Sequence, residues 1–398
     1  MKYTPKFAVI TTALAASLAF TACTSAAATK DSPEEAPKVL TGIAERLVEE
    51  GYPGAIITRT SPDGTAETAT AGTADLATDA PVPADGEVRI GSASKTFTAV
   101  VALQLVEEGL LELDRSVETY LPGIIKGKGI DPKAITVRQL LQHTSGLPEY
   151  TTELIVNEAF ADRDIYRSPR DVLDLALGQP AIFPAGERHQ YTNTNYIALG
   201  LIIERITQRP LAEQIHDRIV TPLDLKHTYL PEPGETGLRG EHPLGYHIDT
   251  DGELRDLTEA DPSWAGAAGA MVSTPAELNT FMKAVLEGEL LEPAELDQML
   301  TGISTGDEEH FPGATYGLGI ESRELSGGTA WGHDGDIPGY QTRNAVAEDG
   351  TAVTLTLTAL PFAIYDGPQD EIFEGPTEEL IALYNLSTDA LEEALSTP

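Results

Sequence analysis

Residues 90–100 read IGSASKTFTAV and place a serine, two small residues and a lysine directly before a long apolar run. On a helix, Ser92 and Lys95 would share a face because they are three residues apart. A serine hydroxyl is a weak nucleophile without an adjacent base, and a buried lysine of lowered pKa can be that base. Alternatively, Ser92 is an ordinary helix cap beside a solvated lysine. Since an S-x-x-K match often arises by chance, the motif alone does not decide between the two.

A second candidate stretch, YTNTNY at 191–196, opens the apolar segment IALGLIIERI. The phenol of Tyr191 can relay a proton when it lies near a lysine, and the amide of Asn193 can hold both a lysine and a substrate carbonyl. The competing interpretation is structural: Asn193 or Thr194 caps the helix and Tyr191 packs. Taken alone, this stretch favours the structural interpretation.

The third candidate stretch is WGHDGDIPGY at 331–340. Glycines at a strand end let the backbone approach a substrate closely, and an amide there can complete an oxyanion hole. His333 and the other histidines do not show metal-ligand spacing such as H-E-x-x-H. HTSG at 143–146 is typical of a turn after a helix, so the sequence predicts no catalytic role for His143.

Composition restricts the classes of partner. The chain has 398 residues, 41% of them hydrophobic, which suffices for a sizeable core in one large or two interleaved domains. Its formal net charge of −37 disfavours nucleic acid as a partner, since a phosphate backbone needs Lys and Arg for neutralisation. The same charge is repelled by anionic lipid surfaces. We expect a monomer.

The N-terminus has the pattern of an export signal. Residues 1–22 combine two lysines with an apolar stretch too short to span a bilayer, and Cys23, the single cysteine, follows at once. This resembles a bacterial lipoprotein signal, with Cys23 lipidated, residues 23–36 as a flexible tether and the protein on the extracellular face of the cell membrane near the cell wall. The alternative is cleavage near residues 26–28 and secretion of a protein without Cys23.

The remaining chain, residues 37–398, predicts an α+β fold. Helical spacing precedes Gly51, a strand hairpin surrounds SPDG at 61–64, and residues 115–300 are mainly helical. Strand patterns return after residue 315, followed by a closing helix at 370–386. The two ends should therefore build one antiparallel sheet flanked by helices, with the segment 115–300 inserted as a helical subdomain. A cleft between sheet and helices is the expected place for a site.

The three stretches in this order resemble the penicillin-recognising serine hydrolases, with their β-lactamase/transpeptidase-like fold. The resemblance is strongest to class C β-lactamases and to Streptomyces-type D-alanyl-D-alanine carboxypeptidases. It covers roughly residues 37–385 and includes ITVRQLLQHTSGL, PSWAGAAGAMVSTPAEL and YGLG as well as the three stretches. It implies a serine hydrolase that acts on small molecules or peptidoglycan peptides, is acylated by β-lactams and needs no metal or cofactor.

The resemblance also implies roles for individual residues. Ser92 attacks the carbonyl, Lys95 and Tyr191 share the acid and base work, and Asn193 orients Lys95 and the acyl group. The backbone amides of Ser92 and of Asp336 form the oxyanion hole. The other residues assigned to the site are His333 on the catalytic strand and, for substrate binding, Trp264 and Gly335.

Acidic residues stand where carboxypeptidases of this family bind the substrate carboxylate. Those enzymes use hydroxyl residues around the third motif and an arginine on the preceding strand. Here the hydroxyl positions hold Asp334 and Asp336, and the arginine position holds Glu321, with Arg323 two residues later on the same strand face. Two carboxylates about 4 Å apart repel by roughly 1 kcal/mol in water and more near a surface. We therefore expect poor binding of a free-carboxylate substrate unless Arg323 compensates.

Three activities remain open within this family: a carboxypeptidase-like hydrolase of D-amino-acid peptides, amides or esters, a β-lactamase, and an esterase. The motifs do not encode how water reaches the acyl-enzyme, which is what separates the three. A penicillin-binding sensor that is acylated without turnover is an alternative of another class, against which Tyr191 argues.

Overall fold

The computed structural model describes residues 38–397 except 152–153, 155–158, 250, 307–313, 326–327 and 368–376. The predicted signal, the tether and Cys23 lie outside the described residues. The helices are α1 Lys38–Glu49, α2 Ser94–Glu107, α3 Val117–Tyr120, α4 Val137–Leu141, α6 Pro169–Leu177, α7 Asn193–Thr207, α8 Leu211–Ile215, α9 Gly266–Gly269, α10 Pro275–Leu286, α11 Pro293–Leu300, α12 Pro361–Ile364 and α14 Glu378–Leu395. Two short helical turns are η1 Gly91–Ala93 and η2 His216–Val220. The strands are β1 Gly54–Thr60, β2 Ala66–Asp75, β3 Ala80–Pro81, β4 Val88–Arg89, β5 Tyr246–Ile248, β6 Leu254–Asp256, β7 Val272–Ser273, β8 Ile303–Ser304, β9 Thr315–Tyr316, β10 Glu321–Leu325, β11 Gly328–Gly332, β12 Gly335–Ile337, β13 Tyr340–Ala347 and β14 Ala352–Leu357.

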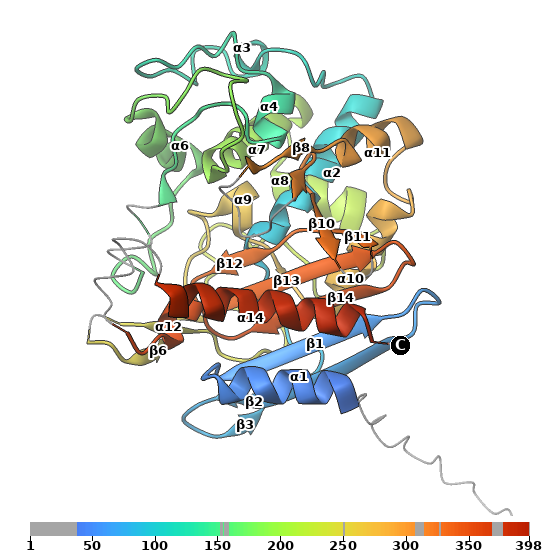
Figure 1. The fold of residues 1–398 in the computed structure, drawn as a ribbon. Helices are drawn as coiled ribbons and strands as arrows, with labels where there is room; N and C mark the ends of the chain where they lie inside the picture. Colours follow the sequence, from blue (N-terminus) through green and yellow to red (C-terminus); the bar gives the residue numbers. More distant parts are fainter. Residues whose placement is uncertain are drawn as a thin grey trace, which may run out of the picture. The chain divides into compact units, whose positions relative to one another are not determined.

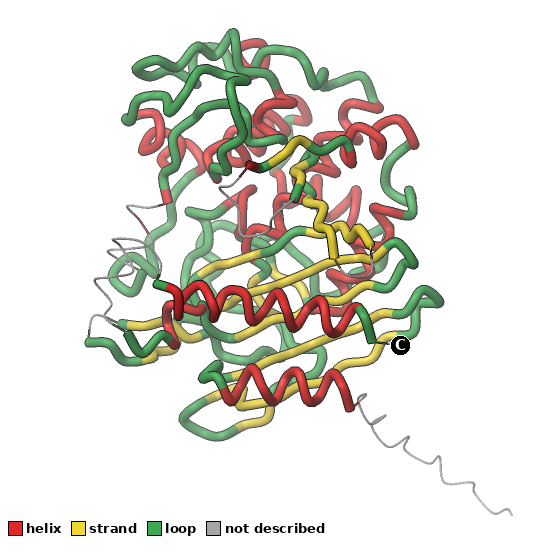
Figure 2. Tube along the Cα trace, viewed as in Figure 1, coloured by secondary structure: helices red, strands yellow, loops and turns green. Residues whose placement is uncertain are grey.

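One antiparallel sheet joins the two ends of the chain, as the sequence predicts (Figures 1 and 2). Its order is β3-β2-β1-β14-β13-β11-β10-β9-β8, and the short strand β12 also pairs with β13. The junction is the pairing of β1 with β14, in register from Ala55 opposite Leu357 to Thr60 opposite Ala352. The predicted α+β fold, with one antiparallel sheet built from both ends of the chain, is thereby confirmed.

The sheet separates two apolar cores because its side chains alternate between faces. On one face, Ala55 and Ile57 of β1 pack with α1 and α14, which cross the sheet in Figure 1. On the other face, Ile56 joins the core that contains α2, α7 and α10. Helix α10 begins at Pro275 after its cap Thr274, as the sequence predicts, and packs against β1, β13 and β14.

The closing helix continues further along the chain than predicted. The sequence pattern favours a helix at 370–386, of which residues 370–376 lie outside the described residues. Helix α14 begins at Glu378, where Thr377 caps the amide of Leu380, and continues to Leu395. Its buried residues Ala390, Leu391 and Ala394 contact the sheet, so tertiary packing extends the helix beyond the predicted end. Within the described ranges, no helix is long and apolar enough to cross a membrane.

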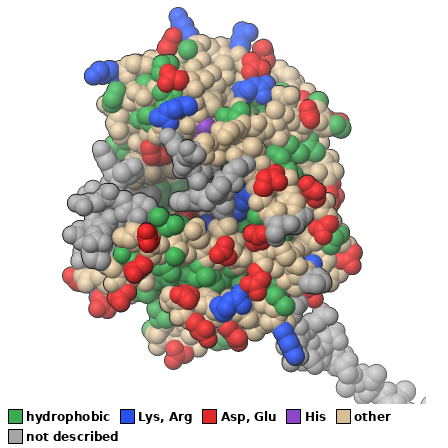
Figure 3. All heavy atoms as spheres, in the orientation of Figure 1, with side chains coloured by type: hydrophobic (Ala, Val, Ile, Leu, Met, Phe, Trp, Pro, Cys, Tyr) green, Lys and Arg blue, Asp and Glu red, His purple; other side chains and the backbone are tan. Residues whose placement is uncertain are grey.

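Negative charge is spread over the surface. In the view of Figure 3, Asp and Glu side chains are scattered over the face that carries α1 and α14 and are not gathered in one patch. Such a distribution supports solubility and does not define a binding site.

Candidate active site

Ser92 and Lys95 meet at the start of α2, as their spacing predicts. The turn η1 carries Ser92, and Lys95 lies one turn further on in α2, where 11 of the helix's 14 residues are buried. The Nζ atom of Lys95 lies 2.9 Å from Oγ of Ser92, 2.7 Å from Oδ1 of Asn193 and 2.7 Å from the carbonyl oxygen of Ala268. Hydroxyl and amine are therefore in direct hydrogen-bond contact, the geometry required for proton transfer.

Burial adapts Lys95 to work as a base. The side chain is fully buried, and this desolvation lowers the pKa of Lys95 from 10.5 to about 7, although the carboxylates of Glu149 and Glu321 act in the opposite direction. Close to neutral pH, a substantial fraction of Lys95 is therefore uncharged and able to accept the proton of Ser92.

Tyr191 and Asn193 reach the same point from the start of α7. Thr192, neither Asn193 nor Thr194, caps this helix by accepting a hydrogen bond from the amide of Thr194. Tyr191 lies just before the cap, and Nζ of Lys95 is 4.8 Å from the centre of its ring. The cap thus places Tyr191 and Asn193 beside Lys95. The purely structural interpretation, which this stretch favours when it is taken alone, does not account for their position.

Glu149 is a site residue that the sequence did not single out. Its carboxylate accepts hydrogen bonds from the backbone amide of Asn193 at 2.7 Å and from the side-chain amide of Asn193 at 3.2 Å. Because the side-chain nitrogen of Asn193 is held there, its oxygen faces Lys95. No motif marks Glu149, since it lies 44 residues from Asn193 in the chain.

Strand β12 brings its backbone against the nucleophile. A Cβ atom placed on Gly335 would lie 1.9 Å from the carbonyl oxygen of Ile90 and 3.0 Å from the amide nitrogen of Ser92. A Cβ atom on Gly91, whose φ is +50°, would lie 2.8 Å from the amide nitrogen of Asp336. The two amides assigned to the oxyanion hole, those of Ser92 and Asp336, therefore lie on adjoining backbone segments whose close approach requires glycine.

Gly335→Ala is expected to lower kcat/KM by about 100-fold, because the new methyl group pushes β12 and its oxyanion amide away from Ser92. Steady-state kinetics check this, with thermal unfolding as a measure of folding. Gly237→Ala is the matched control, since a Cβ atom there meets nothing within 4 Å. Wild-type kcat/KM in Gly335→Ala would contradict the assignment of the oxyanion hole to this strand.

The four charged candidates form ion pairs with one another and with Arg343. Arg323, with 1% of its side chain exposed, lies 2.6 Å from Asp334 and 3.5 Å from Glu321, so β10 places Glu321 and Arg323 together as predicted. Arg343 of β13 lies 2.7 Å from Asp336 and 3.4 Å from Asp334. Burial raises the pKa of Asp334, but Arg323 and Arg343 more than offset this and hold it below its usual range.

Glu321 occupies a different environment in the same cluster. Burial raises the pKa of Glu321 to about 7, with Arg323 acting against the rise and Asp334 adding to it. Three carboxyl groups face two guanidinium groups, so the cluster carries no surplus positive charge at neutral pH. The side chain of Asp336 is held by Arg343, whose Nε donates to Ser387 of α14, and it is the backbone of Asp336 that adjoins η1.

His333 is buried behind the catalytic groups. Its Nε2 lies 2.9 Å from the hydroxyl of Tyr316 and its Nδ1 lies 2.6 Å from the carbonyl oxygen of Asp334. Burial and the nearby Lys95 lower the pKa of His333 to about 3, so the ring is neutral. In the structure both ring nitrogens therefore face protein groups rather than Ser92.

Trp264 lines a cavity beside the end of β12. Its backbone carbonyl accepts a hydrogen bond from the hydroxyl of Tyr150 at 2.7 Å, which fixes the loop that carries it. The cavity is lined by both apolar and charged side chains: Leu154, Ala159, Leu257, Ala260, Pro262, Trp264, Ile337, Pro338, Arg89, Asp162, Arg163, Arg167 and Asp261. Ile337 is the last residue of β12, the strand that carries the oxyanion amide of Asp336, so the cavity adjoins this strand.

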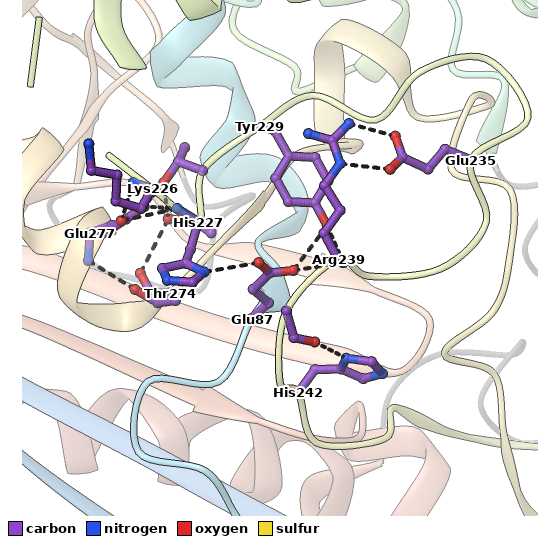
Figure 4. Close-up of polar contacts among 12 residues, drawn as sticks. Glu87, Lys226, His227, Tyr229, Glu235, Arg239, His242, Thr274 and Glu277 are labelled. Carbon is purple, nitrogen blue, oxygen red and sulfur yellow. Dashed lines mark hydrogen bonds and ion pairs between the residues drawn. The ribbon is translucent and has the colours of Figure 1, made fainter. Parts of the chain in front are cut away.

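The segment that leads to Ser92 is anchored by Glu87, shown in Figure 4, and by Arg89. The buried carboxylate of Glu87 accepts hydrogen bonds from Nδ1 of His227 and the hydroxyl of Tyr229, both at 3.1 Å, and from the amide of Arg239 at 2.9 Å. Arg89 donates to the carbonyl oxygens of the loop at 258–260, at 3.1 and 3.0 Å. Residues 87–89 thus hold two loops against β4, the strand that precedes the turn with Ser92.

His143 is a second residue of the site that the sequence did not reveal. HTSG does form a turn, with a φ of +56° at His143, but the imidazole is buried and its ring centre lies 4.2 Å from that of Tyr191. The turn composition of HTSG is the local signal in the sequence, and it does not indicate a catalytic neighbour.

Fold and site define a class of protein. The sequence profile of the family described as Beta-lactamase matches residues 40–367, and the chain belongs to this family of penicillin-recognising serine hydrolases. It is therefore a serine hydrolase.

Several individual proteins are similar to the chain. A D-stereospecific amidohydrolase from Streptomyces sp. has a structure that is 33% identical, with a TM-score of 0.76 over 84% of this chain and 97% of the other. A D-amino acid amidase from Ochrobactrum anthropi SV3, in a complex with L-phenylalanine amide, is 25% identical, with a TM-score of 0.74 over 89% and 97% of the two chains. Penicillin-binding protein 4* of Bacillus subtilis (strain 168) is 26% identical over 285 residues, 68% of this chain and 60% of that protein. The chain spans less than two thirds of the length of the curated relatives that it matches first.

Proposed function

We propose that this serine hydrolase cleaves amides and esters of D-amino acids, and that it is a poor carboxypeptidase for peptides ending in a free carboxylate. The observation that carries this proposal is the state of Arg323. Its guanidinium is almost fully buried and lies 2.6 Å from Asp334, so its charge is already neutralised by the protein. A terminal carboxylate would approach a cluster of three carboxyl groups and two guanidinium groups, which offers it no net attraction.

In the proposed reaction, uncharged Lys95 accepts the proton of Ser92 while the hydroxyl oxygen attacks the substrate carbonyl. The amides of Ser92 and Asp336 stabilise the oxyanion, and Lys95 with Tyr191 returns the proton to the leaving amine. The departing ammonia or amine leaves an ester on Ser92. Water, deprotonated by the same groups, then hydrolyses this ester and releases the D-amino acid.

Two features support a D-amino-acid amide as the substrate. The Streptomyces and Ochrobactrum proteins, both similar over most of their length, are described as a D-stereospecific amidohydrolase and a D-amino acid amidase. The cavity beside Trp264 is lined by apolar and charged side chains, and its apolar members, such as Leu257 and Ile337, suit an apolar acyl side chain.

The test is a set of kcat/KM measurements on D-phenylalanine amide, L-phenylalanine amide, a D-Ala-D-Ala peptide and the C-terminal amide of that peptide. We expect the D-amide to exceed the L-amide, and the peptide amide to exceed the free acid, each by at least about 10-fold, which corresponds to about 1.4 kcal/mol. A clear preference for the free acid would refute the proposal, as would hydrolysis of a chromogenic cephalosporin far faster than any amide.

A further inference from the structure

Three buried aromatic side chains form a row behind the catalytic groups. Nε2 of His143 lies 3.2 Å from the hydroxyl oxygen of Tyr316, and that oxygen lies 2.9 Å from Nε2 of His333. The three come from distant parts of the chain: the turn after α4, strand β9 and the end of β11. None is more than 1% exposed, so the row does not reach the surface or a bound substrate.

The hydrogen bonds at the two ends of the row determine which nitrogen of each imidazole ring carries the hydrogen. The backbone amide of Thr192 can only donate, so Nδ1 of His143, 3.2 Å away, is an acceptor and Nε2 carries the hydrogen of the neutral ring. The carbonyl oxygen of Asp334 can only accept, so Nδ1 of His333 carries the hydrogen of the neutral ring and Nε2 is an acceptor. His143 therefore donates to Tyr316, and Tyr316 donates to His333.

The ends of the row attach to the two halves of the active site. Thr192 lies between Tyr191 and Asn193, and the ring of His143 also packs on Tyr191. Asp334 directly precedes Gly335 and Asp336, the backbone of the oxyanion strand. The row thus links the groups that move the proton to the strand that receives the developing negative charge.

We propose that Tyr316 is a positioning residue: its hydroxyl bridges His143 and His333 and thereby sets the distance between the Tyr191–Asn193 segment and the oxyanion strand. His333 then acts through the backbone of Asp334 and does not exchange a proton with the substrate. Tyr316 is the necessary centre of the row because it is the one member that both accepts and donates through a single atom. This inference concerns acyl transfer at Ser92 and does not depend on which acyl group the enzyme prefers.

Kinetics of the full chain with a short-chain nitrophenyl ester test the proposal. Tyr316→Phe removes only the bridging hydroxyl, and we expect kcat to fall by about 10- to 100-fold with KM changed less than about 3-fold, because small displacements of catalytic groups have effects of this size. His333→Gln, whose amide oxygen can still accept from Tyr316, should retain more activity than His333→Leu. Since both act on one row, Tyr316→Phe combined with His333→Leu should lose little more than the worse single variant.

Tyr246→Phe is the matched control, because it also removes one tyrosine hydroxyl with one hydrogen bond, to the amide of Leu76. Unchanged kcat in Tyr316→Phe, or additive losses in the double variant, would overturn the proposal. A second measurement needs neither substrate nor variant: nitrogen chemical shifts in the wild-type protein should show a hydrogen on Nε2 of His143 and on Nδ1 of His333. The opposite tautomer on either ring would overturn it as well.

Discussion

Ser92→Ala is expected to lower kcat/KM by at least about 10⁴-fold on every substrate that the enzyme hydrolyses. The hydroxyl oxygen is the atom that forms the covalent bond, and it is the nucleophile that Lys95 contacts, at 2.9 Å. Loss of the nucleophile in serine hydrolases leaves only the contribution of the oxyanion hole and of substrate binding. The protein should fold normally, because alanine is smaller and creates no new polar group.

Mass spectrometry makes the same experiment specific for Ser92. After mixing with penicillin, the wild-type enzyme should gain the mass of the opened β-lactam, and Ser92→Ala should not. Ser396→Ala, which changes an exposed serine at the end of α14, is the matched control and should behave as wild type. An adduct on Ser92→Ala, or full activity of that variant, would show that the nucleophile lies elsewhere.

Lys95→Arg is expected to lower kcat/KM by about 10²- to 10⁴-fold and to change the pH profile. In the wild type, the fraction of uncharged Lys95 rises as the pH passes through about 7, so kcat/KM should rise over the same range. An arginine remains charged throughout this range and cannot accept the proton of Ser92. The rise centred near pH 7 should therefore disappear in the variant.

The measurement is kcat/KM between pH 5 and 9 for the wild type, Lys95→Arg and Lys95→Met. The methionine variant controls for the bulk of arginine in a fully buried position, and Lys133→Arg, at an exposed residue, controls for the exchange itself. If Lys95→Met kept the rise near pH 7, another group would be the base, and Glu321, whose pKa is also raised to about 7, would be the first to examine.

The sequence predicts which residues meet at the candidate catalytic centre better than it predicts the residues that hold them in position. Ser92, Lys95, Tyr191 and Asn193 stand at helix starts, where local spacing determines which way a side chain points. Helix period and strand alternation likewise predict the pairing of Glu321 with Arg323 and the sheet built from both ends. The spacing of these four residues and of Glu321 and Arg323 depends on neighbours only a few residues away, whereas the sheet built from both ends follows from the order of the predicted strands and helices.

The supports depend on contacts between distant segments. Glu149 and Arg343 have no motif of their own, and HTSG and YGLG contain His143 and Tyr316 without indicating what these side chains contact. Each of the four takes its role from a partner on another element. Arg343 neutralises Asp334 and Asp336 only because β13 lies beside β12, which a single sequence does not reveal. Because of these ion pairs, the cluster offers a substrate carboxylate no net attraction, whereas the acidic residues alone would repel it.

The pairing of β1 with β14 has a consequence for how this enzyme is made. Thr60 pairs with Ala352, so the centre of the sheet cannot close until almost the whole chain is available. At synthesis rates of about 5–20 residues per second, the first strands wait for roughly 15–60 s before their partner emerges. During that time the apolar side chains of β1 and α1 lack the C-terminal residues that pack on them in the folded protein. The helices between β1 and β14 can already fold. Conditions that delay the last strands should therefore leave a partly folded, aggregation-prone chain and not a smaller active enzyme.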